Sequence, residues 1–224
     1  EDRASLEGDT FDIGYTLGAL YEYSDQTRFG IGYRSQVKHK LKGDIKFEGL
    51  MLPANQDISA RITTPANLTI GAYHDINDKW SVMAEFGRTY WSSFDTLDIY
   101  GENNGKMSTT EERWKDTTFY AIGASYQYND QWKFRVGFAV DQSAVGQEYR
   151  TPRIPDSDRL WYSSGIEYKY NDDWTFNLGY TYIRADKGKV KLLGYHDGDN
   201  ARGSLQADYE NDIHILGFGA SYIF

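Results

Sequence analysis

The amino-acid sequence predicts an all-β protein, an antiparallel transmembrane β-barrel, from three observations. Apolar and polar residues alternate over segments of about ten residues, the length of a tilted strand that crosses an outer-membrane hydrocarbon layer. The 224 residues include 19 Tyr, 11 Phe and 22 Gly but only 4 Pro, which favours long strands over helices. The mean hydropathy of −0.67 agrees with a wall that is apolar outside and polar inside.

The strands are predicted one by one from this alternation. In the clearest segment, charged or small residues alternate with Trp132, Phe134, Val136, Phe138 and Val140. Comparable alternation predicts nine strands in chain order, at 9–23, 27–41, 59–75, 79–98, 114–128, 131–145, 159–170, 173–188 and 207–224. A soluble β-sandwich or a lipocalin-like barrel is the alternative. The membrane barrel is favoured because one face is aromatic and branched, while the other carries Gly, Ser, Thr and charges of both signs.

Short turns and long connections alternate along the chain. Asn129 and Asn171 each begin a nearly identical turn that ends in Trp, and Asn77 begins a third copy. Asn and Asp tolerate the backbone of tight hairpin turns. The long connections are 42–58, 99–112, 146–158 and 189–206. In outer-membrane barrels the short turns are periplasmic and the long loops extracellular, which predicts the orientation of this chain.

Nine crossings that end in the periplasm place the N-terminus outside the cell. Bacterial single-chain barrels have an even number of strands, and an open sheet edge in lipid leaves backbone groups unpaired. We therefore expect residues 1–224 to be one barrel domain, the C-terminal portion of a larger barrel, with no separate second domain. The alternative is that one of the predicted strands is wrong.

Five segments resemble the FadL/TodX family of outer-membrane transporters of hydrophobic compounds. They are Phe29 to Asp44, Trp114-Lys115-Asp116, Asp141-Gln142-Ser143, Arg153 to Trp161 and Gly217 to Phe224. The resemblance implies part of a fourteen-stranded barrel that carries long-chain fatty acids or, in some members, aromatic hydrocarbons. It also implies an N-terminal hatch and a kinked strand for lateral exit, neither of which has a counterpart in this sequence. This portion alone is therefore not expected to be a competent transporter.

Charge and motifs exclude several other function classes. The formal net charge of −9 is unfavourable for nucleic-acid binding, which depends on phosphate contacts. Without cysteine, the chain has no disulfide or thiolate metal site. The four histidines lie in no GxSxG or HExxH motif, so we expect no enzyme. Asp197-Gly198-Asp199-Asn200 lacks the spacing of a calcium loop and predicts a turn, and no cofactor or metal is expected.

Two groups of residues are candidates for ligand binding. Leu50, Met51 and Leu52 form an apolar tip on a long loop, which would either capture an acyl chain or pack against a neighbouring loop. Arg113 and Lys115 lie where a long loop meets the wall. They would pair either with a fatty-acid carboxylate or with nearby acidic residues.

Charged residues predicted to face the lumen form a further group, and we expect them to pair across strands because unpaired buried charge is costly. This group is Arg28, Arg34, Glu85, Lys133, Arg135 and Glu167. Gly219, Tyr222 and Phe224 resemble the terminal signal read by the barrel-assembly machinery.

The predicted function is passive outer-membrane transport of long-chain fatty acids or other hydrophobic small molecules in a Gram-negative bacterium. The expected partners are that ligand, outer-membrane lipid and the assembly machinery, and the full-length protein is expected to be monomeric. The alternatives are a small structural or adhesive outer-membrane barrel and a general porin.

Overall fold

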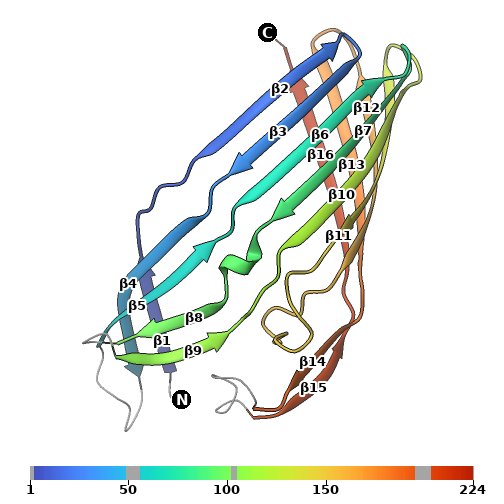
Figure 1. The fold of residues 1–224 in the computed structure, drawn as a ribbon. Coiled ribbons are helices and arrows are strands. Elements are labelled where there is room, and N and C mark those ends of the chain that lie inside the picture. The colour runs from blue at the N-terminus through green and yellow to red at the C-terminus, as the bar shows by residue number, and fades with distance from the viewer. Residues whose placement is uncertain (1–2, 49–55, 102–104, 195–202, 224) are drawn as a thin grey trace.

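A curved antiparallel sheet of nine strands forms the body of the molecule, which has the shape of a trough (Figure 1). The computed structural model describes residues 3–48, 56–101, 105–194 and 203–223. The spatial order is β16-β13-β12-β11-β10-β7-β6-β3-β2, so β2 and β16 are the edge strands of this sheet. Its strands are β2 (Thr16–Ser24), β3 (Thr27–Arg34), β6 (Asn67–Asp75), β7 (Trp80–Thr89), β10 (Thr117–Gln127), β11 (Trp132–Asp141), β12 (Arg159–Lys169), β13 (Trp174–Ala185) and β16 (Asp212–Tyr222). The predicted fold class is confirmed.

Smaller sheets lie at the end of the trough opposite the short turns (Figure 1). One sheet has the order β1-β4-β5-β8-β9, and β14 pairs with β15. Their bounds are β1 (Arg3–Asp9), β4 (Val37–Glu48), β5 (Gln56–Thr64), β8 (Thr96–Tyr100), β9 (Lys106–Glu111), β14 (Gly188–Leu192) and β15 (Leu205–Tyr209), with the 3-10 turn η1 (Trp91–Ser93) between β7 and β8. We call this end of the molecule the hairpin end and the opposite end the turn end.

Several predicted boundaries are wrong because strands bend or pair in places that alternation does not reveal. The predicted strand 59–75 is two strands that break at Pro65, which cannot donate a ladder hydrogen bond. The predicted strand 27–41 breaks at Ser35, whose Oγ accepts a bond from Tyr15 N at 3.0 Å. The strands predicted at 9–23 and 79–98 are shorter, at Thr16–Ser24 and Trp80–Thr89.

The predicted long connections are also more regular than expected. The connections 42–58, 99–112 and 189–206 contain the ends of β4 and β5, the β8–β9 hairpin and the β14–β15 hairpin. These segments form strands because their backbone groups pair with one another beyond the nine-stranded sheet. The connection 146–158 has only an isolated bridge between Thr151 and Ile154. Leu50, Met51 and Leu52 lie outside the described residues.

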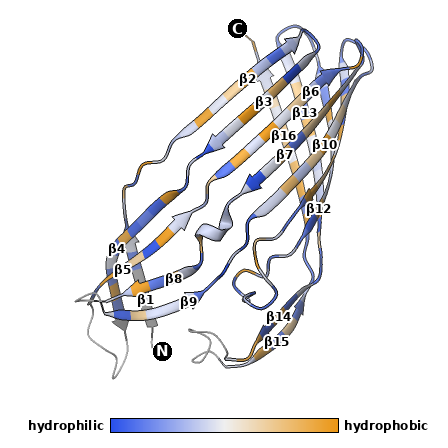
Figure 2. Ribbon diagram, in the orientation of Figure 1, coloured by the Kyte–Doolittle hydropathy of each residue, from blue (hydrophilic) through white to orange (hydrophobic). Residues whose placement is uncertain are grey.

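The nine-stranded sheet exposes its apolar side chains more than its charged ones. On β11, the exposed positions Phe134, Val136 and Phe138 alternate with the less exposed Lys133 and Arg135. Figure 2 shows the resulting bands of apolar and polar residues along the strands. Burial of this kind is the reverse of that in a protein surrounded by water, and it identifies the apolar face as the lipid-contacting wall.

The described residues contain no helix that is both long enough and apolar enough to cross a membrane.

Three of the short turns share one hydrogen-bond pattern, in which an Asn side chain accepts two backbone N–H bonds. The Asn129 Oδ1 accepts bonds from the backbone N–H of Gln131 at 3.0 Å and of Trp132 at 2.9 Å. Asn171 does the same for the residues two and three positions later, at 3.1 and 2.7 Å. Asn77 forms the third copy at 2.9 and 3.0 Å. The side chain therefore satisfies turn donors that have no ladder partner.

Cross-strand aromatic pairs stand beside these turns on the lipid face. Their ring centroids lie 4.6 Å apart for Trp80 and Tyr126, and 4.4 Å apart for Trp132 and Tyr168. A third pair joins Trp174 to Tyr222 at 4.9 Å. Such rings prefer the membrane–water boundary, so they mark where the wall leaves the hydrocarbon.

We expect Asn129→Ala to lower the free energy of unfolding by about 1 kcal/mol, because two turn donors lose their acceptor. Urea unfolding followed by tryptophan fluorescence in lipid vesicles measures the change. Asn129→Asp is the matched control because its carboxylate accepts the same two bonds. An equal loss in both variants would contradict the role of the acceptor.

Candidate ligand groove on the inner wall

Small residues line the middle of the inner wall and leave a groove there. In the strand register, Gly30 lies opposite Gly71, and Gly123 lies opposite Gly137. Ala121 occupies the adjacent inward position on β10. A cavity of about 600 Å³ lies over these residues. The groove exists because side chains that would fill it are missing, while the backbone ladder continues beneath.

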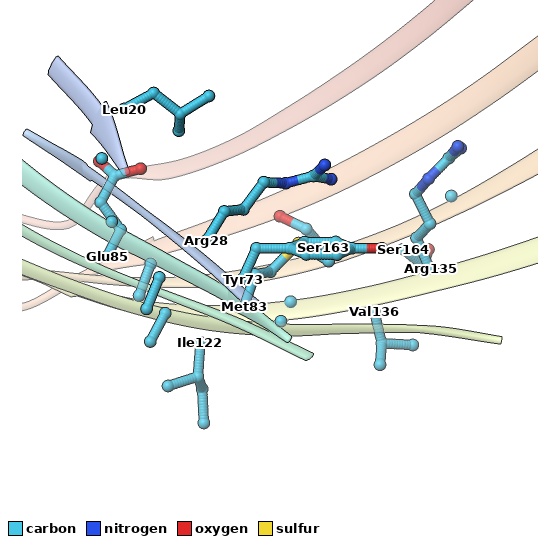
Figure 3. Close-up of a pocket in the computed structure, with 18 residues that line it drawn as sticks. Leu20, Arg28, Tyr73, Met83, Glu85, Ile122, Arg135, Val136, Ser163 and Ser164 are labelled. Carbon is cyan, nitrogen blue, oxygen red and sulfur yellow. The ribbon is translucent and has the colours of Figure 1, made fainter. Parts of the chain in front are cut away.

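The sides of the groove are mainly apolar. Leu20 from β2 and Met83 from β7 contribute the large apolar side chains. Figure 3 shows Leu20 on the inner side of the sheet, whereas Ile122 and Val136 point away on the other side. The neighbouring strands therefore present small groups to the groove and branched groups to lipid. This arrangement suits an apolar ligand, since binding buries its surface without displacing polar contacts.

A belt of polar residues closes the groove on the side of the turn end. Glu167 on β12 pairs with Arg135 and lies 4.0 Å from Lys133 Nζ, both on β11. Arg135 also donates to Asn177 Oδ1 at 3.4 Å. On the other side of the trough, the Tyr73 hydroxyl donates to Asp75 at 2.6 Å. Mutual pairing keeps these charged groups satisfied at the wall.

A second polar belt lies toward the hairpin end. Arg159 bridges two carboxylates, at 2.9 Å to Asp141 and 3.2 Å to Asp156. Beside it, the rings of Phe119 and Trp161 meet edge to face at 6.3 Å. The inner wall is therefore apolar between two ion-paired belts.

Two charged side chains lie within the apolar stretch. The Arg28 guanidinium carbon lies 4.1 Å over the Tyr73 ring. Glu85 comes from β7, and Figure 3 shows both side chains on the inner side of the sheet. Within the described ranges, neither residue forms an ion pair. The groove therefore offers a cation and a carboxylate to the polar end of a ligand.

A smaller polar cavity of about 450 Å³ lies at the hairpin end. Its cationic lining residues are Lys115, Arg150, Lys187 and Lys189. Arg150 is buried, and it donates to the backbone oxygens of Asp156 at 2.7 Å and Lys189 at 2.9 Å. The Arg150 guanidinium thus ties the connection 142–158 to β14 and leaves its positive charge beside the cavity. Hydrogen bonding to Glu210 raises the pKa of Lys187, so this lysine is also cationic.

The predicted lumen residues lie in three places on the inner wall. The structure brings Lys133, Arg135 and Glu167 together across β11 and β12. Arg34 lies at the end of β3 opposite Asn67, away from that cluster. Arg28 and Glu85 line the groove, as does Arg135 of the cluster.

The other predicted site residues lie apart from the groove. Arg113 pairs with Glu111 at 3.3 Å and has φ of 42°. Lys115 lines the polar cavity. Gly219 lies opposite Asn177, and Tyr222 packs on Trp174. Phe224 lies outside the described residues.

Sequence reasoning did not select the floor of the groove or Arg150. The signal for the floor was present, because the inward positions of several strands are Gly or Ala at the same level. Register is needed to see that these positions are adjacent. The described part of the chain contains no group of three or more His, Asp or Glu that could hold a metal ion.

Comparison with known proteins agrees with this architecture. The family model described as outer membrane protein transport protein (OMPP1/FadL/TodX) matches residues 2–224. The chain belongs to this family. The predicted resemblance is thereby confirmed, and the lipid-facing wall is that of an outer-membrane β-barrel.

Individual relatives match about half of their own length. A long-chain fatty acid transport protein of Escherichia coli is 30% identical over 236 residues, which cover 99% of this chain and 52% of that protein. The crystal structure of a Pseudomonas aeruginosa FadL homologue aligns with a TM-score of 0.84 and 26% identity, over 93% of this chain and 52% of that one. The P. putida toluene transporter TodX shares the fold, with a TM-score of 0.64 and 21% identity, over 99% of this chain and 53% of that one. The chain therefore spans about half the length of the relatives it matches.

Acid should remove one stabilising contact at the hairpin end. Hydrogen bonding from Ser92 and the positive charge of Arg88 hold the pKa of Asp116 below its ordinary value of 3.8. Because the folded-state pKa is the lower one, this contribution is present above pH 3.8 and is lost as the pH falls through the folded-state pKa.

We expect Asp116→Ala to cost about 1 kcal/mol of unfolding free energy at neutral pH and much less in acid, where Asp116 of the parent protein is protonated. Urea unfolding at both pH values measures the difference. Asp78→Ala, in an exposed turn, is the control. A constant difference at both pH values would contradict the assignment.

Proposed function

We propose that this chain forms part of an outer-membrane barrel that carries hydrophobic small molecules by passive diffusion, with long-chain fatty acids as the leading substrate class. The observation that carries the proposal is the apolar groove of about 600 Å³ between two ion-paired belts. An acyl chain would lie over the glycines, where burial of each CH₂ contributes about 0.8 kcal/mol. A general porin would need a polar lumen, whereas the floor of this groove is made of glycine and alanine.

Cationic side chains support an acidic amphiphile over a plain hydrocarbon. Arg28 lines the groove, and Lys115 lines the polar cavity nearer the hairpin end. Each offers charge-assisted hydrogen bonds to a carboxylate. A ligand would meet Lys115 first if it enters from the hairpin end, which is the extracellular side in the predicted orientation.

The names of the relatives support hydrophobic small molecules as the wider class of substrate. One is named a long-chain fatty acid transport protein, and another is titled a toluene transporter. No step in this function needs a reacting group, cofactor or metal, and we propose no enzymatic activity. We propose further that residues 1–224 act as one domain and that the full-length protein is monomeric and enters the membrane through the barrel-assembly machinery, with Gly219, Tyr222 and Phe224 in the terminal signal.

The groove is tested by filling it. We expect Gly71→Leu to weaken binding of a labelled long-chain fatty acid at least tenfold, because the new side chain occupies the space of about two methylene groups or more. Equilibrium binding to the purified full natural chain in detergent gives the affinity.

Gly179→Leu is the matched control. Gly179 lies on β13 outside the groove lining, and an added Cβ there meets no atom within 4 Å. Equal weakening by both substitutions would place the ligand elsewhere. Absence of saturable binding to the parent protein would overturn the transport proposal, and ion conductance in planar bilayers would then support a porin.

A second comparison separates the substrate classes. We expect Lys115→Gln to weaken binding of a fatty acid but not of toluene. The substitution removes a charged partner of the fatty-acid carboxylate, and toluene has no carboxylate. Competition against the labelled fatty acid measures both ligands. Equal effects on the two ligands would assign Lys115 a purely structural role.

A further inference from the structure

Polar side chains gather at one place on the lipid-facing wall. The place is the outer-face tyrosine cluster, which we define as Tyr162 on β12, Tyr180 and Tyr182 on β13, and His214 on β16. The Tyr180 hydroxyl lies 2.7 Å from His214 Nδ1. A cavity of about 550 Å³ lies over these four residues. The Tyr180 hydroxyl and the His214 imidazole bond each other, and the exposed amphipathic rings beside them suit the polar head group of a lipid better than its acyl chains.

The rings of the cluster are stacked into one surface. Tyr182 stacks on His214 with centroids 5.0 Å apart and on Tyr162 at 6.2 Å. Tyr162 and Tyr180 are 44% and 42% exposed, so their faces and edges are open to a ligand. Flat amphipathic rings of this kind pack against the C–H faces of sugars while their hydroxyl groups hydrogen-bond.

The position of the cluster matches the far boundary of the membrane. Trp174 marks the boundary at the turn end, and Tyr182 lies eight positions further along β13 (182 − 174). At about 3.4 Å per residue and a tilt of about 40°, this distance is about 20 Å along the membrane normal. The apolar band of such barrels is about 25 Å tall. Tyr182 therefore lies just inside the far boundary of the apolar band, and Arg184, two positions further along β13, lies at that boundary on the hairpin side.

A cation stands directly beyond the cluster. Arg184 follows on the same face of β13, is exposed, and lies opposite Asp212 in the register. Asp212 Oδ1 accepts the Tyr182 hydroxyl at 3.0 Å. Within the described ranges, Arg184 forms no ion pair, so its guanidinium fork is available to a phosphate.

We propose that the outer-face tyrosine cluster and Arg184 bind the head group of a phosphorylated glycolipid of the outer leaflet. The sugar ring would lie on Tyr162 and Tyr180, the phosphate on Arg184 and His214, and the acyl chains along the apolar wall toward the turn end. This proposal depends on the membrane orientation used in the proposed function, but it concerns the opposite face of the sheet from the groove.

Native mass spectrometry of the full natural chain, released from detergent micelles, tests the proposal. The probe is a diphosphorylated, acylated glucosamine disaccharide, compared with its dephosphorylated form and with phosphatidylglycerol. We expect the parent protein to retain the diphosphorylated probe about tenfold more tightly than either of the other two lipids. We expect Arg184→Gln and Tyr162→Phe each to weaken retention, Arg184→Gln by about tenfold.

Arg61→Gln on β5 is the charge-matched control, and Tyr170→Phe beside a short turn is the control for the hydroxyl. The shift in electrophoretic mobility between heated and unheated samples reports whether each variant folds. Equal retention by the parent protein and by both cluster variants would overturn the proposal. Equal binding of phosphatidylglycerol would also overturn it and leave a general contact with anionic lipid.

Fatty-acid binding is measured on the same samples, so the two proposals can fail separately. Loss of glycolipid retention with intact fatty-acid binding rejects only the outer-face site. Intact retention without fatty-acid binding rejects only the transport function.

Discussion

Backbone hydrogen bonding across neighbouring strands is the constraint on which this structure depends. In lipid, an N–H or C=O group without a partner has no water to replace it. The nine-stranded sheet meets this requirement by antiparallel pairing of consecutive strands along the whole trough. Side chains are then free to differ between the two faces, because the ladder does not depend on them. The alternation of outer apolar and inner small or charged residues is the visible result.

The same constraint applies to the two edge strands of the nine-stranded sheet. β2 and β16 end the strand order, and each therefore carries one row of backbone groups without a partner in the described sheet. The relatives that the chain matches are about twice as long as the aligned part. A barrel wall made by further strands would cover both rows at once, and it would also close the groove and both ion-paired belts into one lumen.

Much of the nine-stranded sheet could be predicted from the sequence, because period-two alternation reports directly which side of a sheet a residue faces. The short turns were equally predictable, since Asn77, Asn129 and Asn171 carry their own hydrogen-bond acceptors. The break at Pro65 and the extra hairpins were not predicted, because alternation continues through a bend and says nothing about which strands pair beyond it.

Prediction of the sites would have required the strand register even more than prediction of the fold. Arg135 and Glu167 are 32 positions apart, and only the pairing of β11 with β12 brings them into contact. The glycines of the groove are adjacent for the same reason. Arg150 lies in an irregular connection, where neither propensity nor periodicity indicates a partner, and its three-dimensional environment alone reveals its role.

The glycine floor has a consequence for how relatives of this protein could diverge. Most binding sites are shaped by side chains, so a change of specificity disturbs contacts that also hold the fold together. Here the deepest surface of the groove is main chain, which the ladder fixes independently of residue identity. Single methyl groups added at Gly30, Gly71 or Gly137 would therefore narrow the groove in small steps and in any order, while the backbone of the wall stays unchanged. Substrate range would then change nearly independently of the stability of the fold.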